Sequence, residues 1–163
     1  MDSAFTLEIL TPDRQFYVGP AQAVILPILD GQYGVQPGHE PVVTAIEPGE
    51  LKYQVDGAWR TASVSTGFAE IMPDYAILLV AACERPEEID LKRAEAAKAR
   101  AEERLRQKGS LQEYHSSQAA LSRALARLKT AKRSKETKSG APSPALRSLS
   151  VPWFKFIFYN RRK

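Results

Sequence analysis

Short stretches in which apolar and polar residues alternate run through the first half of the chain. Phe5, Leu7 and Ile9 alternate with polar neighbours, which is the period-two pattern of a strand with one face in a core. The run Tyr75–Ala82 is apolar throughout, so we expect it to form a strand that is buried on both faces. Further strands are predicted around Phe16 and Trp59 and over residues 23–29, 42–46, 51–55 and 68–71.

Turn residues separate these strands at short intervals. Asp56-Gly57 lies between two alternating runs, and this pair is the strongest short-range signal of a β-hairpin because both residues adopt positive φ. Pro48-Gly49 and Pro73-Asp74 close other strands, and no helical period appears before Pro86. Many short strands with frequent turns predict an antiparallel β-sandwich or a barrel over residues 1–85.

The pattern changes to a helical one at Pro86. Proline is favoured in a first helical turn, and the acidic residues Glu87, Glu88 and Asp90 complement the positive end of the helix dipole. We therefore expect a helix from Pro86 to Gly109. Its apolar face consists mainly of alanines, which lets a partner helix approach closely: Ile89, Ala94, Ala97, Ala101 and Leu105.

A second helix follows almost at once. Ser110 and Glu113 have the spacing of a capping box, and an apolar stripe of Tyr114, Leu121, Leu125 and Leu128 follows. A connection of about two residues makes an antiparallel hairpin. The predicted fold is α+β in three parts: an N-terminal antiparallel β-sandwich (1–85), a two-helix hairpin (86–133) and a flexible linker with a basic, aromatic tail (134–163).

The charge distribution supports this division into modules. Residues 1–85 contain 4 Lys/Arg and 11 Asp/Glu, a net charge of −7, whereas residues 86–163 contain 19 and 8, a net charge of +11. An acidic front half and a basic back half are atypical of one evenly mixed globule.

Composition excludes several classes of protein. Cys83 is the only cysteine, so neither an intrachain disulfide nor a thiolate zinc site can form, and its apolar surroundings favour a buried small hydrophobe over a reactive thiol. The longest apolar run, Tyr75–Cys83, is far shorter than the roughly 20 residues of a membrane helix. With neither a transmembrane segment nor a secretory signal in view, we expect a cytosolic chain or one attached to a membrane through partners.

No catalytic constellation is visible. The chain has no phosphate loop, no dinucleotide-binding fingerprint and no zinc-protease motif. His39 and Glu40 are adjacent in the Pro-Gly loop 36–41, but no nucleophile accompanies them, so a structural or interface loop is favoured over a general base. We expect a non-enzymatic protein that needs no metal.

Basic residues carry the more specific signal. Arg93 and Arg100 are seven residues apart on the first predicted helix, and Arg123 and Arg127 are four apart on the second, so each pair shares a helix face. If the helices fold back, the four guanidiniums converge on one seam, where their forked donors suit phosphate oxygens. A solvated basic face is the alternative that spacing alone leaves open.

Three stretches resemble the epsilon subunit of bacterial F-type ATP synthase. Residues 31–41 (GQYGVQPGHEP) are similar to that family's G-x-x-G-[IV]-x-P-G-H-x-P loop. Residues 65–71 (STGFAEI) resemble its S-G-G-[FI]-x-E-[IV] strand, with Thr66 in place of the first glycine. Residues 89–94 (IDLKRA) match its I/L-D-x-x-R-A motif. The resemblance covers residues 5–133 in order and length.

The resemblance implies a non-catalytic subunit of the rotating central stalk. In this family a β-sandwich docks on the gamma subunit and the c-ring, and two helices either fold against the sandwich or extend towards the alpha and beta subunits and block ATP hydrolysis. It also implies a peripheral membrane protein on the cytoplasmic face of the bacterial plasma membrane. The basic back half suits the acidic segment of the beta subunit that such helices face.

The resemblance also implies ATP as a regulatory ligand. In members that bind ATP the folded hairpin holds it, and ATP then favours the compact, non-inhibitory form. The arginines are expected to neutralise phosphates, and the two carboxylates to bind base or ribose or to orient the arginines, although Asp90 has a second interpretation as a helix cap. The matching positions here are Glu84, Asp90, Arg93, Ala94, Arg100, Arg123 and Arg127.

The tail is a departure from the family. Residues 134–163 have no counterpart in it and combine an aromatic cluster with a basic end. A membrane-interface anchor, a partner-binding segment and a segment without a role are three open interpretations. A nucleic-acid-binding module that uses the basic helices is the alternative function; the −7 charge of the front half opposes it, so we expect no nucleic-acid partner.

Overall fold

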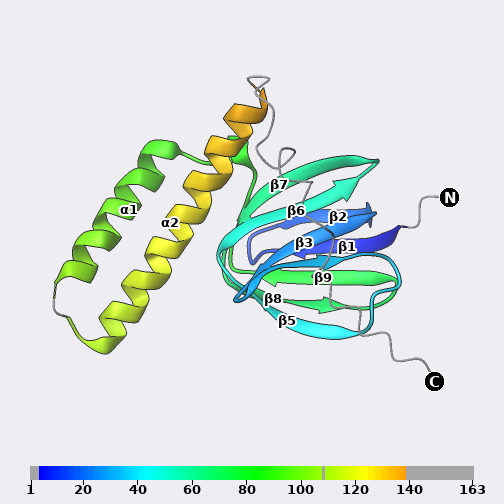
Figure 1. The fold of residues 1–163 in the computed structure, drawn as a ribbon, viewed down its shortest axis with the longest axis horizontal. Coiled ribbons are helices and arrows are strands. Elements are labelled where there is room, and N and C mark those ends of the chain that lie inside the picture. The colour runs from blue at the N-terminus through cyan, green and yellow to red at the C-terminus, as the bar shows by residue number, and fades with distance from the viewer. Residues whose placement is uncertain (1–3, 108, 139–163) are drawn as a thin grey trace, which may run out of the picture.

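The computed structural model describes residues 4–107 and 109–138, which form a β-sandwich followed by a helical hairpin (Figure 1). The order of strands in the first sheet is β2 (Gln15–Ala21), β1 (Phe5–Leu10), β9 (Tyr75–Val80), β8 (Gly67–Ile71) and β5 (Val42–Ile46). The order in the second sheet is β10 (Cys83–Glu84), β7 (Ala58–Val64), β6 (Gly49–Val55), β3 (Ala23–Ile28) and β4 (Gly31–Val35). The pair β1–β9 is parallel and the others are antiparallel. The predicted α+β fold with an N-terminal sandwich is confirmed.

The core lies between the two sheets and is built by alternation along the strands. Leu7 and Ile9 of β1 point inward and are fully buried, as are Leu51 of β6 and Leu78 of β9. Asp56 and Gly57 both have positive φ, 52° and 75°, in the tight turn between β6 and β7, so the predicted hairpin is confirmed.

Strand β9 differs from its expected burial. Ala76, Leu78 and Val80 face the core, but Ile77 is half-buried and Leu79 is 39% exposed. The prediction of a strand buried on both faces was therefore wrong: the apolar run has one face in the core and the other on the surface of the sandwich.

One strand gave no recognisable pattern. β4 carries two glycines, Gly31 and Gly34, and pairs with β3 at the edge of the second sheet. Only Val35 of this strand is buried, so its sequence offers little of the alternation that identifies a half-buried strand.

The first helix starts later than the sequence predicted. A 3₁₀ turn, η1 (Pro86–Glu88), precedes α1 (Leu91–Arg106). Asp90 is extended and its side chain accepts a hydrogen bond from the backbone N–H of Arg93 at 3.1 Å. This N-cap satisfies a backbone donor in the first turn, and it explains why the α-helix begins at Leu91 and not at Pro86.

The second helix, α2 (Leu111–Lys138), begins at the predicted capping box. The backbone N–H of Ser110 donates to Glu113 Oε2 at 2.7 Å, and the N–H of Glu113 donates to Ser110 Oγ at 3.2 Å. Its buried face is made largely of small residues, so the apolar stripe was partly wrong: Leu128 is buried, but Tyr114 and Leu125 are 50% and 45% exposed. The buried residues are Ser117, Ala124, Ala126, Leu128, Thr130 and Ala131.

Helix α2 lies between α1 and the sandwich and packs antiparallel to α1 (Figure 1). On the other side it contacts β6 and β7 of the second sheet. It runs to Lys138, five residues past the expected end of the hairpin, because Lys and Glu favour helices and the first glycine after Ala131 is Gly140. The rest of the predicted tail, from residue 139, lies outside the described residues.

Candidate functional site

A small pocket opens where α2 meets the edge of the second sheet. Arg123 and Arg127, four residues apart, project from α2 towards Glu84 on β10. Glu84 pairs with Ser63 of β7 in the sheet, so both side chains lie on the outer face that α2 covers. The lining residues are Ser63, Val64, Ser65, Ala82, Glu84, Arg123 and Arg127.

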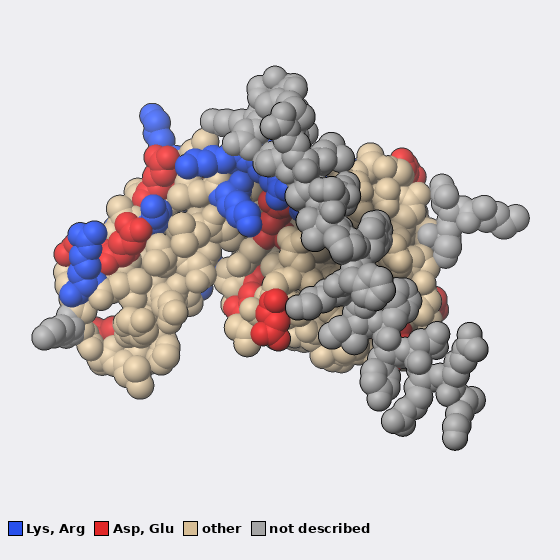
Figure 2. Space-filling model, in the orientation of Figure 1, with Lys and Arg blue, Asp and Glu red and all other residues tan. Residues whose placement is uncertain are grey.

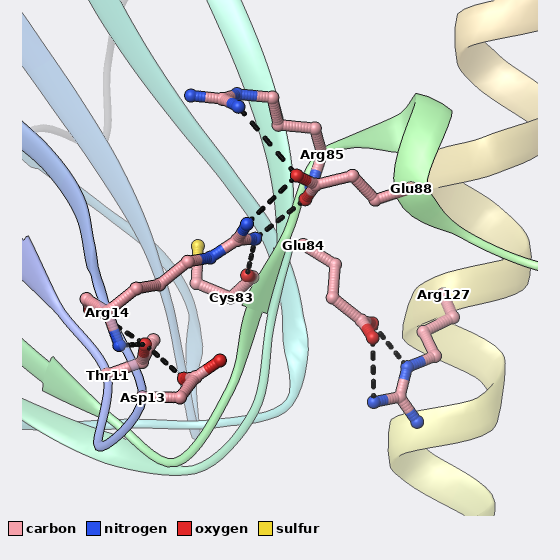
Figure 3. A network of polar contacts seen from close by, with 8 residues as sticks. All are labelled: Thr11, Asp13, Arg14, Cys83, Glu84, Arg85, Glu88 and Arg127. Carbon is pink, nitrogen blue, oxygen red and sulfur yellow. Dashed lines mark hydrogen bonds and ion pairs between the residues drawn. The ribbon is translucent and has the colours of Figure 1, made fainter.

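Glu84 and Arg127 form a two-bonded ion pair across this junction (Figure 3). Arg127 Nε donates to Glu84 Oε2, and Arg127 Nη2 donates to Glu84 Oε1 at 3.3 Å. Both side chains are about one-third exposed, at 33% and 32%. The paired geometry suits a guanidinium and a carboxylate, and the same fork is the one that binds two oxygens of a phosphate group.

The pocket is too small for a nucleotide in this conformation. Its volume is about 10 Å³, which is room for a single water molecule. Glu84 occupies the fork of Arg127, so an anion that binds this arginine either displaces the carboxylate or approaches from the solvent side.

The four remaining candidate residues lie at the start of α1 or along it. Asp90 caps the helix, and Ala94 is buried at 4% exposure in the seam with α2. Arg93 and Arg100 are exposed and do not line the pocket. The structure thus brings Glu84, Arg123 and Arg127 together, and it places the other candidates on the neighbouring helix.

A second polar network ties the inter-module linker, residues 85–90 between β10 and α1, to the sandwich (Figure 3). Arg14, in the turn between β1 and β2, donates to Glu88 Oε1 at 3.0 Å and to Oε2 at 2.8 Å, and also to the Cys83 carbonyl at 3.1 Å. The backbone N–H of Arg85 donates to Glu88 Oε2 at 2.8 Å. The hydrogen bonds from Arg14 and then from Arg85 lower the pKa of Glu88 to about 2. No pattern in the sequence indicates this network, because Arg14 and Glu88 are 74 residues apart.

A third ion pair lies further along α2. Arg133 Nη1 donates to Glu50 Oε1 of β6 at 2.9 Å, and Lys52 Nζ lies 3.3 Å from the same oxygen. The Glu50 side chain is only 3% exposed. Glu50 stands at an outward position of a strand, where an acidic residue is ordinary, so nothing in its pattern pointed to a buried partner.

The surface charge reflects these contacts. Figure 2 shows Lys and Arg side chains gathered where the upper part of the hairpin meets the sandwich, with acidic side chains below them on the sandwich. Across the junction of hairpin and sandwich, Arg127 and Arg133 of α2 pair with Glu84 and Glu50.

The histidine loop has a structural arrangement. His39 Nε2 lies 3.1 Å from the Tyr33 hydroxyl, and Nδ1 lies 2.8 Å from the Glu40 carbonyl. Since a carbonyl only accepts, Nδ1 carries the proton and Nε2 accepts from Tyr33. Both ring nitrogens are therefore engaged, one by Tyr33 of β4 and one by the loop backbone, which favours the structural interpretation of His39.

The outer face of the first sheet carries an apolar row. Ala45 pairs with Phe68, Phe68 with Leu79, and Leu79 with Leu10, across β5, β8, β9 and β1. Phe68 is 49% exposed, and Val43, two residues before Ala45 on β5, is 68% exposed. We call Val43, Ala45, Phe68 and Leu79 the apolar face. A contiguous exposed apolar surface typically marks a protein-binding site.

Two further properties bear on function. Within residues 4–107 and 109–138, no group of three or more His, Cys, Asp or Glu side chains is placed to hold a metal ion. Neither described helix combines the length and apolar character that crossing a bilayer requires.

Two family models of known proteins match this chain, one over the sandwich and one over the hairpin. The model of the ATP synthase Delta/Epsilon chain beta-sandwich domain matches residues 4–86, and that of the long alpha-helix domain matches residues 87–132. The ATP synthase epsilon chain of Ruminiclostridium cellulolyticum is 50% identical over 131 residues, which are 80% of this chain and 98% of that one. The epsilon chain of Caldanaerobacter subterraneus subsp. tengcongensis is 49% identical over 137 residues, 83% of this chain and 99% of that one.

A solved structure shares the fold. A chain in the Euglena gracilis mitochondrial ATP synthase OSCP/F1/c-ring structure has a TM-score of 0.69 and 22% identity, with 80% of this chain and 82% of that chain covered. Because both modules match the family models and the bacterial relatives align over nearly their whole length, the chain belongs to the ATP synthase delta/epsilon chain family.

Proposed function

We propose that this chain is a non-catalytic rotor subunit of an F-type ATP synthase that joins the catalytic head to the c-ring, and that its hairpin regulates ATP hydrolysis in response to ATP. The sandwich docks on the gamma subunit and the c-ring, and the basic helices engage the beta and alpha subunits. Such a complex places the chain peripherally on the cytoplasmic face of the bacterial plasma membrane. The family membership of both modules is the observation that carries this proposal.

The apolar face supports docking through the first sheet. α2 covers the second sheet, whereas the row through Phe68 and Leu79 stays exposed on the opposite side of the sandwich. Burying this row against a partner removes apolar surface from water, at about 25 cal/mol per Å². We therefore assign the apolar face to the stalk.

Co-purification with the gamma subunit tests the docking face. Phe68→Glu introduces a charge into the row and is expected to reduce recovered complex at least ten-fold. Trp59→Glu is the matched control, because Trp59 is equally exposed, at 51%, but lies on the second sheet. Wild-type recovery by Phe68→Glu contradicts the assignment of this face, and absence of any wild-type complex contradicts the subunit function itself.

The junction supports regulation by a nucleotide. Arg123 and Arg127 offer forked donors at the surface between α2 and the sandwich, and Arg93 and Arg100 add positive charge on α1. In this proposal the arginines neutralise the phosphates, Glu84 and Asp90 bind base or ribose or orient the arginines, and Ala94 keeps the helices close. ATP that binds only the folded hairpin stabilises that form by its differential affinity.

Titration calorimetry of the isolated chain tests the nucleotide site. Wild type is expected to bind ATP, and Arg93→Ala or Arg123→Ala to weaken binding about ten-fold or more, since each removes a charge-assisted contact to phosphate. Arg104→Ala, an exposed arginine on α1 outside the candidate set, is the control. If wild type gives no heat at millimolar ATP, the chain is no nucleotide sensor, although its subunit function stands.

A further inference from the structure

Two carboxylates on the second sheet lie in one row across three strands. Glu84 of β10 pairs with Ser63 of β7, and Ser63 pairs with Glu50 of β6. The three side chains therefore share the outer face beneath α2, and the carboxylates are two strand spacings apart, about 9.5 Å along the row.

Helix α2 carries two arginines at a matching separation. Arg127 and Arg133 are six residues apart, which is about 9 Å of helix. Arg127 pairs with Glu84 and Arg133 pairs with Glu50. The distance of about 9 Å between the two arginines along the helix is close to the separation of about 9.5 Å between the two carboxylates, and a shift of α2 by one turn, about 5.4 Å, separates both pairs at once. The two contacts together favour one docking position of the helix.

The two pairs differ in burial. Glu84 is about one-third exposed, whereas the Glu50 side chain is 3% exposed. Glu50 Oε2 and the hydroxyl of Thr130, midway between the arginines, are buried without a hydrogen-bond partner among the described residues. A buried carboxylate that loses a cationic partner is strongly destabilised, so the docked helix depends more on Arg133 than on Arg127.

We propose that the Glu50–Arg133 pair is a latch that holds the hairpin on the sandwich whether or not a nucleotide is bound. The latch rests on the proposed function in one respect, namely that the two helices of the hairpin leave the sandwich together. The partly exposed Glu84–Arg127 pair is then the exchangeable contact, at which a phosphate can replace the carboxylate, while the latch keeps α2 in register.

The latch makes an asymmetric prediction. Arg133→Gln leaves the Glu50 charge under α2 with Lys52 as its remaining cationic partner among the described residues, so α2 lifts more often. Glu50→Gln removes the buried charge and leaves Arg133, 32% exposed, able to turn towards water. In the double variant no buried carboxylate is left without its cationic partner. Glu50→Gln is therefore expected to suppress much of the defect of Arg133→Gln.

A thiol placed beneath α2 reports the lifting of the helix in the full chain. Ser63 is 4% exposed on the outer face of the second sheet, and its neighbour Val64, 2% exposed, faces the core. Ser63→Cys is labelled when α2 lifts, whereas Val64→Cys is labelled only when the sandwich opens. Native Cys83 stays in place, because burial raises the pKa of its thiol to about 12.

Labelling with a thiol reagent is compared between the two positions. The thiol at position 63 is expected to react faster than that at position 64. Arg133→Gln is expected to raise the rate at position 63 by about ten-fold or more, as loss of a charge-assisted bond predicts, and to change position 64 far less. Adding Glu50→Gln is expected to reverse most of that increase. Glu102→Gln, which breaks the exposed Lys98–Glu102 pair within α1, is the control without effect.

The possible results separate the latch from the proposed function. An unchanged rate at position 63 in Arg133→Gln, or a double variant that is labelled faster than the single one, overturns the latch alone. Equal rates at positions 63 and 64 in every variant mean that the hairpin does not leave the sandwich separately, which overturns both hairpin release and the latch. Circular dichroism on each variant confirms that the compared chains are folded.

Discussion

Glu88 shows how single residues join the two modules. Its carboxylate accepts two hydrogen bonds from Arg14 and one from the Arg85 backbone, so a turn of the sandwich holds the 3₁₀ turn that leads into α1. The guanidiniums of Arg14 and Arg85 also lie 5.5 and 5.2 Å from the Phe16 ring, a distance typical of cation–π contacts. The inter-module linker, residues 85–90, is therefore held against the sandwich before α1 begins.

Acid is expected to weaken this anchor. The hydrogen bonds from Arg14 hold the pKa of Glu88 at about 2, below its ordinary value of 4.5. The unfolded chain therefore binds this proton more readily than the folded chain, and the contribution of Glu88 to stability, complete above about pH 5, is lost as pH falls towards 2. In urea denaturation between pH 7 and pH 2, the stability gap between wild type and Glu88→Gln is expected to narrow on acidification. A constant gap contradicts this role of the carboxylate.

Gly67 is a second residue with a demanding environment. A Cβ at this position lies 2.1 Å from the Leu79 carbonyl oxygen and 2.7 Å from Val80 Cα, so Gly67→Ala forces β8 away from β9. We expect a loss of more than about 2 kcal/mol of unfolding free energy. Thr66, which replaces a glycine of the family motif, is exposed, and Thr66→Gly is expected to change stability by about 1 kcal/mol or less. Denaturant midpoints compare the two variants; equal losses contradict the close approach at Gly67.

Among the elements, those with a strong local signal were predictable and those determined by partners were not. The Asp56-Gly57 hairpin and the Ser110/Glu113 capping box follow from backbone chemistry within a few residues. The exposure of Leu79 did not follow from its apolar run, because an exposed apolar face and a core face have the same composition. The start of α1 shifted because Asp90, and not the residue before Pro86, satisfies the first-turn donors.

Two substitutions separate the capping role of Asp90 from its proposed role towards ATP. Asp90→Ala removes the acceptor for the Arg93 N–H and is expected to cost about 1 kcal/mol of stability. Asp90→Asn keeps a capping oxygen and is expected to be nearly neutral in stability. Thermal unfolding measures the cap and calorimetry with ATP measures the ligand role. If Asp90→Asn binds ATP as wild type does, Asp90 acts only as a cap.

At the scale of the whole molecule, the acidic sandwich and the basic hairpin are joined by two specific ion pairs. The acidic sandwich supplies Glu50 and Glu84, and the basic hairpin supplies Arg127 and Arg133. The helical spacing of the arginines was visible in the sequence, and three of the residues that the family resemblance pointed to, Glu84, Arg123 and Arg127, line one pocket in the structure. The pairs of Glu50 with Arg133 and of Arg14 with Glu88 were not predicted, since these partners are 83 and 74 residues apart in the sequence. The packing of α2 and of the inter-module linker against the sandwich brings them together.

The latch and the proposed nucleotide site are expected to be coupled through hairpin docking. If ATP binds only the docked hairpin, its apparent dissociation constant equals the intrinsic one divided by the docked fraction. Arg133→Gln, which lies outside the candidate ATP set, is then expected to weaken ATP binding by the factor by which it lowers that fraction, and Glu50→Gln in the same chain to restore it. Arg127→Ala is expected to weaken ATP binding by a larger factor than the one by which it lowers the docked fraction, because Arg127 also belongs to the candidate ATP site.

Parallel measurements on the same variants decide whether this coupling exists. Thiol labelling at position 63 gives the docked fraction, and calorimetry gives the apparent ATP affinity. If Arg133→Gln lowers the docked fraction and the apparent ATP affinity by the same factor, the result supports coupling through docking. A variant that changes only the population of the docked form changes these two quantities equally. A loss of ATP affinity much larger than the loss of docking means that Arg133 contacts the nucleotide directly. An unchanged affinity with a substantially reduced docked fraction means that ATP does not require the folded hairpin.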